Sequence, residues 1–132
     1  MKKLKGLVIM FLISLSLFGL TACQGGENKS TYEQITAEQA KNIMDTEKDY
    51  IIIDARTEEE FAEGHIEDAI LIPESEISFR AEKELPDKNT LILVYCRSGR
   101  RSKIASEELV KLGYTNVKEF GGIIDWPYEI VK

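Results

Sequence analysis

The segment from Cys96 to Ser102 gathers a thiol, three arginines and several small residues. It follows a strand pattern and precedes a helical one, so Cys96 is expected at the N-terminus of a helix. There, unpaired backbone N–H groups and the helix dipole stabilise a thiolate or a bound oxyanion. Ser98 and Gly99 are small enough for the backbone to curl into an anion-binding nest. The pattern indicates a reactive thiol at Cys96 beside a nest that can hold an anion, with positive charge supplied by Arg97, Arg100 and Arg101.

The N-terminus has the form of an export signal. A basic head, Met1–Lys5, precedes the apolar run Gly6–Leu20, which closes on Leu20-Thr-Ala-Cys23. This ending resembles a bacterial lipobox, and the resemblance implies diacylglycerol attachment to Cys23 and cleavage just before it. The alternative is an uncleaved membrane helix, but the apolar run is shorter than the roughly 20 residues that a bilayer span needs.

These features divide the chain into three parts. Residues 1–22 are expected to be a lipoprotein signal peptide, and residues 23–30, which are polar after Cys23, a flexible tether. Residues 31–132 suit one small domain with a single core. The lipid on Cys23 would hold this domain in the cell envelope, on the extracytoplasmic face of a bacterial membrane.

The charge balance weighs against nucleic acid as a partner. Of 17 basic residues, three lie in the expected signal peptide, so the remainder has 14 basic and 23 acidic residues and a formal net charge of −9. A nucleic-acid-binding domain is usually basic. The arginines beside Cys96 are therefore a local feature of an acidic domain.

Cysteine counting favours a reactive thiol. The chain has two cysteines, and lipidation of Cys23 leaves Cys96 as the sole free thiol. In an exported protein an unpaired cysteine is either a reactive group or half of an intermolecular disulfide. A buried apolar cysteine ahead of a solvated basic turn is the alternative. The surrounding small and basic residues favour reactivity.

Strand and helix patterns alternate along the rest of the chain. Helices are expected from the capping box Thr36–Gln39, from Thr57 to Gly64, over Ser75–Leu85, from the Cys96 segment to Gly113, and around Trp126 at the C-terminus. Strands are expected over Tyr50–Asp54, Ala69–Ile72, Thr90–Tyr95 and Asn116–Phe120. This alternation predicts an α/β fold with a mainly parallel sheet, helices on both faces, and a site at the carboxyl ends of the strands.

Three segments in order resemble the rhodanese family of sulfurtransferases. The Cys96–Ser102 loop is similar to the active-site loop of that family. The upstream pattern runs from Ile53-Asp-Ala-Arg56 through an acidic helix to Gly64-His-Ile66, and Gly121-Gly122 with Trp126 forms the third. The family's phosphatase relatives have a loop one residue longer, and the shorter loop here suits sulfur rather than phosphate.

The resemblance implies a rhodanese-like domain with a five-stranded sheet and a sulfur relay on Cys96. Cys96 would take sulfane sulfur from a donor such as thiosulfate or polysulfide and hand it, from a persulfide, to a thiol or cyanide-like acceptor. The residues from Arg97 to Arg101 would bind the donor's oxyanion and the persulfide. The alternative is an exported rhodanese-fold binding or redox module that senses or carries sulfur without turnover. The chain keeps the nucleophile and the basic loop and has no Cys-x-x-Cys, which favours the enzyme.

The remaining polar residues have supporting roles. Asp54 and Arg56 are expected either to form an ion pair that braces the Cys96 loop or to be a simple surface pair. His65 suits a structural hydrogen bond to the backbone better than a role as a general base. No second cysteine or histidine lies near Cys96 in the sequence, so neither a metal nor a cofactor is expected, and the domain is expected to be a monomer.

Overall fold

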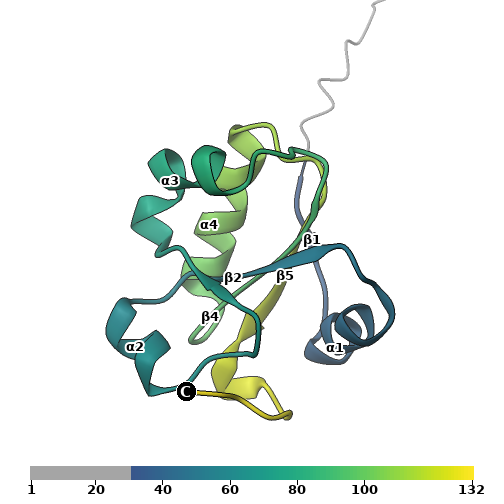
Figure 1. Ribbon diagram of the computed structural model, residues 1–132, viewed down its shortest axis with the longest axis vertical. Helices are drawn as coiled ribbons and strands as arrows, with labels where there is room; N and C mark the ends of the chain where they lie inside the picture. Colours follow the sequence, from purple (N-terminus) through teal and green to yellow (C-terminus); the bar gives the residue numbers. More distant parts are fainter. Residues whose placement is uncertain (1–30) are drawn as a thin grey trace, which may run out of the picture.

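The computed structural model describes residues 31–132, which form one five-stranded parallel sheet (Figure 1). The strand order is β1-β5-β4-β2-β3. The strands are β1 (Glu33–Gln34), β2 (Tyr50–Asp54), β3 (Ile70–Leu71), β4 (Leu91–Cys96) and β5 (Val117–Gly122). The predicted α/β class with a parallel sheet is confirmed.

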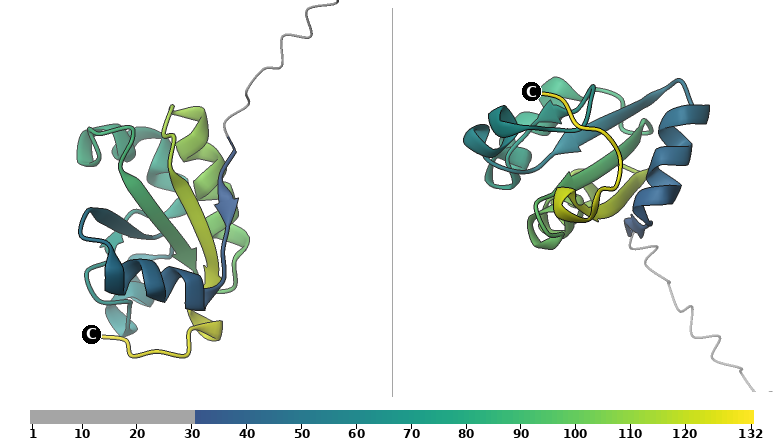
Figure 2. Two further views of the ribbon diagram at one scale, coloured as in Figure 1. Left: turned by 90° about the vertical axis from the view of Figure 1, so that its right-hand side faces the viewer. Right: turned by 90° about the horizontal axis from the view of Figure 1, so that it is seen from below.

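Helices cover both faces of the sheet (Figure 2). They are α1 (Ala37–Thr46), α2 (Glu58–Glu63), α3 (Ile77–Glu84) and α4 (Arg100–Lys111), with single 3-10 turns at Glu74–Glu76 and Ile123–Asp125. One core cluster joins β2, β4 and β5 to α3 and α4, and a second joins the opposite face of the sheet to α1 and the C-terminal segment. The expected two-sided packing is therefore present.

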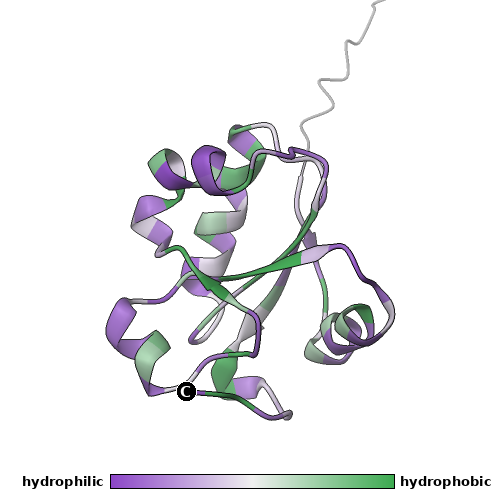
Figure 3. Ribbon diagram, in the orientation of Figure 1, coloured by the Kyte–Doolittle hydropathy of each residue, from purple (hydrophilic) through white to green (hydrophobic). Residues whose placement is uncertain are grey.

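Strand β4 lies at the centre of this arrangement because its residues are apolar on both faces. Ile92 and Val94 pack toward α3 and α4, whereas Leu93 and Tyr95 belong to the opposite cluster. The central strands are accordingly the most hydrophobic part of the ribbon (Figure 3). This double burial fixes the end of β4, and with it the position of Cys96.

The capping boxes form as predicted. Thr36 accepts a hydrogen bond from the Gln39 amide while the Gln39 side chain accepts one from the Thr36 amide, and Thr57 and Glu60 make the same exchange at α2. Each box satisfies two amides that the helix would otherwise leave unpaired. In the second box, the Glu60 carboxylate also accepts hydrogen bonds from Arg101, in the segment that follows Cys96.

Two sequence predictions are wrong. The buried strand expected over Ala69–Ile72 is a two-residue strand at the sheet edge, where Ile70 is 37 % exposed. The expected terminal helix is a single 3-10 turn, after which the chain runs extended and Val131 pairs with His65. Trp126, which follows that turn, is half-buried against Phe120. Strand β1 had no recognisable pattern in the sequence.

The expected signal peptide, the lipid site at Cys23 and the tether lie outside the described residues. Within residues 31–132, no helix has both the length and the apolar character needed to cross a membrane.

Candidate active site around Cys96

Cys96 is the last residue of β4 and is 1 % exposed. The Gly99 amide donates a hydrogen bond to its Sγ over 3.0 Å. Gly99 has a φ of +105°, a region in which side chains other than glycine are strained. The chain therefore turns sharply after β4 and brings the N-terminus of α4 over the sulfur.

The loop of residues 96–101, here called the Cys96 loop, presents several free donors. The amides of Ser98, Arg100 and Arg101 have no hydrogen-bond acceptor within residues 31–132. Helix α4 is 12 residues long, so its dipole adds partial positive charge at the same place. Such a loop can stabilise negative charge on sulfur or on a bound oxyanion.

The three arginines of the loop differ in their surroundings. Arg97 and Arg100 are exposed and form no ion pair with another described residue. Arg101 instead makes two hydrogen bonds to Glu60, of 2.8 and 2.9 Å, and this contact raises the pKa of Arg101. The expectation of three free charges around the nest is therefore corrected: Arg101 connects the loop to α2, because Glu60 lies within reach of its guanidinium.

The contact with Arg101 also changes Glu60. The hydrogen bond from Arg101 is the largest cause that lowers the pKa of Glu60, to about 2, and the Thr57 amide lowers it further. A carboxyl with a depressed pKa in the folded state stabilises the protein above its unfolded pKa, about 4.3. This contribution is lost as the pH falls from there through about 2.

We therefore expect Glu60→Gln to cost about 1 kcal/mol of unfolding free energy at neutral pH, since the pair is partly exposed to solvent. Glutamine still completes the capping box, so the variant isolates the ion pair. Urea unfolding at several pH values should show the difference from wild type vanishing toward about pH 2. Glu108→Gln, which removes an exposed pair with Lys111, is the control and should cost less. A constant difference at all pH values would contradict this assignment.

Gly122 lets β5 pass against the Cys96 loop. A Cβ at this position would lie 2.0 Å from the Arg97 carbonyl oxygen and 2.6 Å from the Ser98 Cα. The Ile124 amide then donates to the same Arg97 oxygen over 3.2 Å. The Gly121-Gly122 pair was recognised only by resemblance, and the structure supplies its physical reason at Gly122.

Two polar residues next to Cys96 were missed by the sequence analysis. Ser102, in the first turn of α4, is fully buried with its Oγ 3.3 Å from Cys96 Sγ. Its hydroxyl donates to Glu119 of β5 over 2.6 Å, and Glu119 is 3 % exposed. The signal for Glu119 was strand alternation, which places it on the same buried face as Val117.

Asp54 and Arg56 form a buried ion pair and are therefore not a simple surface pair. The Arg56 guanidinium donates to both carboxylate oxygens of Asp54 and to the Gly64 carbonyl oxygen. The Tyr95 hydroxyl donates to Asp54 over 2.6 Å, and burial, with the charge of Asp54, raises the pKa of Tyr95. Tyr95 immediately precedes Cys96, so the pair braces the end of β4 rather than contacting the loop itself.

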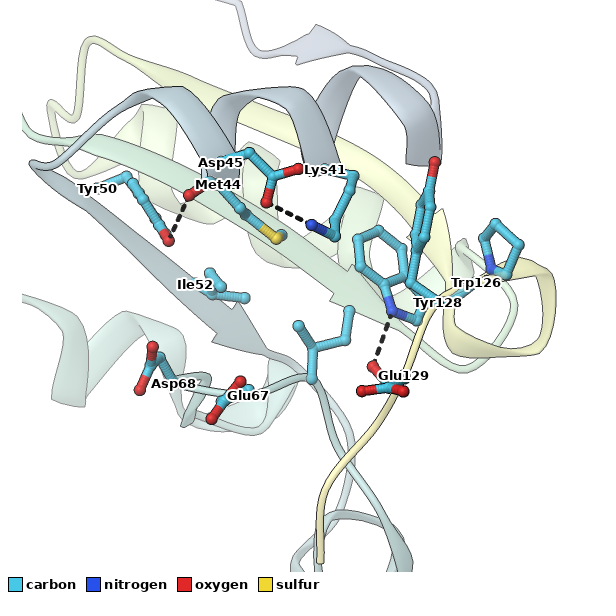
Figure 4. A pocket seen from close by; sticks show the side chains of 12 residues that line it. Lys41, Met44, Asp45, Tyr50, Ile52, Glu67, Asp68, Trp126, Tyr128 and Glu129 are labelled. Carbon is cyan, nitrogen blue, oxygen red and sulfur yellow. Dashed lines mark hydrogen bonds and ion pairs between the residues drawn. The ribbon is translucent and has the colours of Figure 1, made fainter.

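His65, the single histidine of the sequence, contacts the backbone of α2. The Nδ1 of His65 lies 2.9 Å from the Phe61 carbonyl oxygen, in keeping with the structural role expected for it. Over the described range, no group of three or more potential metal-ligating side chains comes together. A groove of about 750 Å³ lies elsewhere, between α1 and the segment Trp126–Glu129, and none of its lining residues belongs to the Cys96 loop (Figure 4).

Comparison with known proteins agrees with this geometry. The model of the rhodanese-like domain family matches residues 36–127. Thiosulfate sulfurtransferase PspE of Escherichia coli is 42 % identical over 80 residues, which are 61 % of this chain and 77 % of the relative. A solved structure described as rhodanese with anions from E. coli has a TM-score of 0.59 at 40 % identity, covering 63 % of this chain and 98 % of that one.

A further relative is named as a carrier rather than an enzyme. The putative sulfur carrier protein YrkF of Bacillus subtilis is 36 % identical over 101 residues, or 76 % of this chain, which spans only 54 % of that relative. The relatives of this chain thus include proteins named as sulfurtransferases and a protein named as a putative sulfur carrier.

The fold, the Cys96 loop and the family match together define a rhodanese-like protein, and the chain belongs to the rhodanese family. Within that family its similarity to named sulfurtransferases supports sulfur transfer of the rhodanese type.

Proposed function

We propose that the protein transfers sulfane sulfur from an anionic donor, such as thiosulfate or polysulfide, through a Cys96 persulfide to a thiol or cyanide-like acceptor. The observation that carries this proposal is the hydrogen bond from the Gly99 amide to Cys96 Sγ, within a loop whose neighbouring amides are free. The name of the E. coli relative supports thiosulfate as a donor.

The reaction needs two displacements at sulfur. The Cys96 sulfur gives up its proton and attacks the outer sulfur of thiosulfate; an S–S bond forms on Sγ, the donor's own S–S bond breaks, and sulfite leaves with the electron pair. A nucleophilic acceptor then attacks the outer sulfur of the persulfide, and Cys96 leaves as a thiolate. The free amides of Ser98, Arg100 and Arg101 supply donors for the charge on donor and persulfide.

A sulfur carrier that loads Cys96 without repeated turnover is the second candidate, favoured by the similarity to the putative carrier YrkF. The two differ in whether a small acceptor regenerates Cys96. Product formed in large excess over protein, with thiosulfate and cyanide supplied, supports the enzyme; one equivalent per protein supports the carrier.

The unpaired arginines provide a test of the donor site. Arg97→Ala and Arg100→Ala should each lower kcat/KM for thiosulfate about fivefold, the equivalent of about 1 kcal/mol for a charge pair near the surface. Stability should change by less than about 0.5 kcal/mol. Lys103→Ala, which removes an exposed cation farther along α4, is the control and should leave kcat/KM unchanged. If both arginine variants keep the wild-type kcat/KM, the donor binds elsewhere.

We further propose that the protein acts as a monomeric domain of residues 31–132 in the cell envelope, anchored through lipid on Cys23 and a tether of residues 23–30. The proposal rests on the Leu20-Thr-Ala-Cys23 ending of an apolar run behind a basic head, in residues 1–22. It places sulfur transfer on the extracytoplasmic side of the membrane.

Replacement of the lipidation residue tests the anchor. Cys23→Ala should abolish incorporation of a labelled fatty acid into the protein and stop cleavage before residue 23, because the sulfur that carries the lipid is gone. Sulfur transfer by the purified variant should be unaffected. Wild-type chains that begin at Cys23 and carry no labelled fatty acid would rule out the lipobox.

A further inference from the structure

A continuous line of hydrogen bonds connects the Cys96 thiol to a buried carboxylate. Cys96 Sγ donates to Ser102 Oγ over 3.3 Å, and Ser102 Oγ lies 2.6 Å from Glu119 Oε1. The carbonyl oxygens of Gly99 and Gly121 are also within reach of this hydroxyl, at 3.0 and 3.4 Å. A hydroxyl has one proton, and the short, charge-assisted contact to Glu119 takes it. A lone pair of Ser102 is then left for the thiol proton.

Folding alone gives no reason for a carboxylate at this position. Glu119 is 3 % exposed and forms no ion pair with any residue in the described part of the chain. Both hydrogen bonds that its side chain accepts, from Ser102 and from the Gly121 amide, fall on Oε1. A buried carboxylate without a cation is costly, and an apolar residue such as Val117 already fills the same strand face.

The charged and titratable groups around Glu119 come from three elements. Cys96 faces it from β4 through Ser102 of α4, and Arg101 of α4 interacts with Cys96. On the β1 side lies Tyr32, whose pKa is raised by burial and, to a smaller degree, by Glu107 and Glu119. Cys96 is the one group in this set that Glu119 reaches through a hydrogen-bonded hydroxyl.

We propose that Glu119 is a positioning residue for Cys96 that takes up the thiol proton through Ser102; this inference rests on the proposed function. As Sγ attacks the outer sulfur of the donor, its proton passes to Ser102 Oγ while the hydroxyl proton passes to Glu119 Oε1. Sulfite leaves with the electron pair of the broken S–S bond, so no oxidant is needed. When an acceptor removes the sulfur, Cys96 leaves as a thiolate and the proton returns by the same route.

The test compares Glu119→Gln with wild type in the first step alone. The amide oxygen of glutamine still accepts hydrogen bonds but does not take a proton at these pH values. Persulfide formation with thiosulfate, followed by quenching and mass spectrometry of the full chain, should slow about tenfold or more near pH 6. The difference in rate between the variant and wild type should narrow as the pH rises, because hydroxide in solvent then competes with Glu119 for the proton. Glu107→Gln, an exposed carboxylate on α4, should match wild type throughout.

Ser102→Ala removes the hydroxyl between Cys96 and Glu119. Its rate of persulfide formation should also approach that of wild type as the pH rises, so this variant provides the test if Glu119→Gln does not fold. Ser106→Ala removes a buried serine one turn farther along α4 and serves as its control. Wild-type rates in Glu119→Gln, or a loss that does not change with pH in both variants, would overturn the proton route and leave the proposed function standing. Absence of a persulfide on the wild-type protein would overturn the proposed function and this inference together.

Discussion

Cys96→Ala is expected to lower sulfur transfer from thiosulfate by at least about 1000-fold, the scale of loss when a covalent nucleophile is removed. Cys96 is the residue of the loop whose side chain can hold the transferred sulfur, and Cys23 lies in the expected lipid anchor. The buried side chain becomes smaller by one sulfur atom, so the substitution should lower the unfolding free energy by only about 1 kcal/mol. Steady-state kinetics with thiosulfate and cyanide measure the loss.

Circular dichroism and thermal unfolding serve as the control, because the variant should keep the fold. Ser106→Ala, a small change at another buried position of α4, should keep wild-type activity. A Cys96→Ala protein that retains a tenth or more of the wild-type rate would place the chemistry on another group.

Gly122→Ala has the second largest expected effect, because it pushes β5 against the Cys96 loop. The new methyl group would lie 2.0 Å from the Arg97 carbonyl oxygen, and the atoms it meets are backbone, which cannot rotate away. The loop must shift, and a shift of about 1 Å at a reacting group can cost about 100-fold in rate. The unfolding free energy should fall by about 1–3 kcal/mol from overpacking.

Gly113→Ala is the matched control for this variant. Gly113 has a positive φ of +96° but nothing within 4 Å of the added methyl group. It should lose about 1 kcal/mol through backbone strain and keep its activity. A Gly122→Ala protein with wild-type kcat/KM would show that the loop tolerates displacement.

Local signals in the sequence predicted the elements that carry the site. The apolar run of β4, the capping boxes at Thr36 and Thr57, and the start of α4 after Gly99 all depend on neighbours a few residues apart, which sequence patterns record well. The positions of Cys96 and its loop at the end of the central strand follow from them.

Local sequence patterns did not predict contacts between segments that are far apart in the chain. The partners Tyr95 and Asp54 are 41 positions apart, as are Arg101 and Glu60, so no sequence pattern indicated the Tyr95–Asp54 hydrogen bond or the Arg101–Glu60 ion pair. The terminal helix failed for the same reason: pairing between Val131 and His65 favours an extended chain after Asp125. The hydrogen bond between Ser102 and Glu119 likewise forms only because α4 packs against β5.

The most direct test of the central claim is to identify the atom that receives sulfur. Purified wild-type protein is treated with thiosulfate, digested without reductant and mapped by mass spectrometry, with Cys96→Ala treated in parallel. The account predicts one added sulfur atom on the peptide that contains Cys96, removed by cyanide and absent from the variant. An unmodified Cys96 peptide, or an added sulfur that persists in Cys96→Ala, would contradict it.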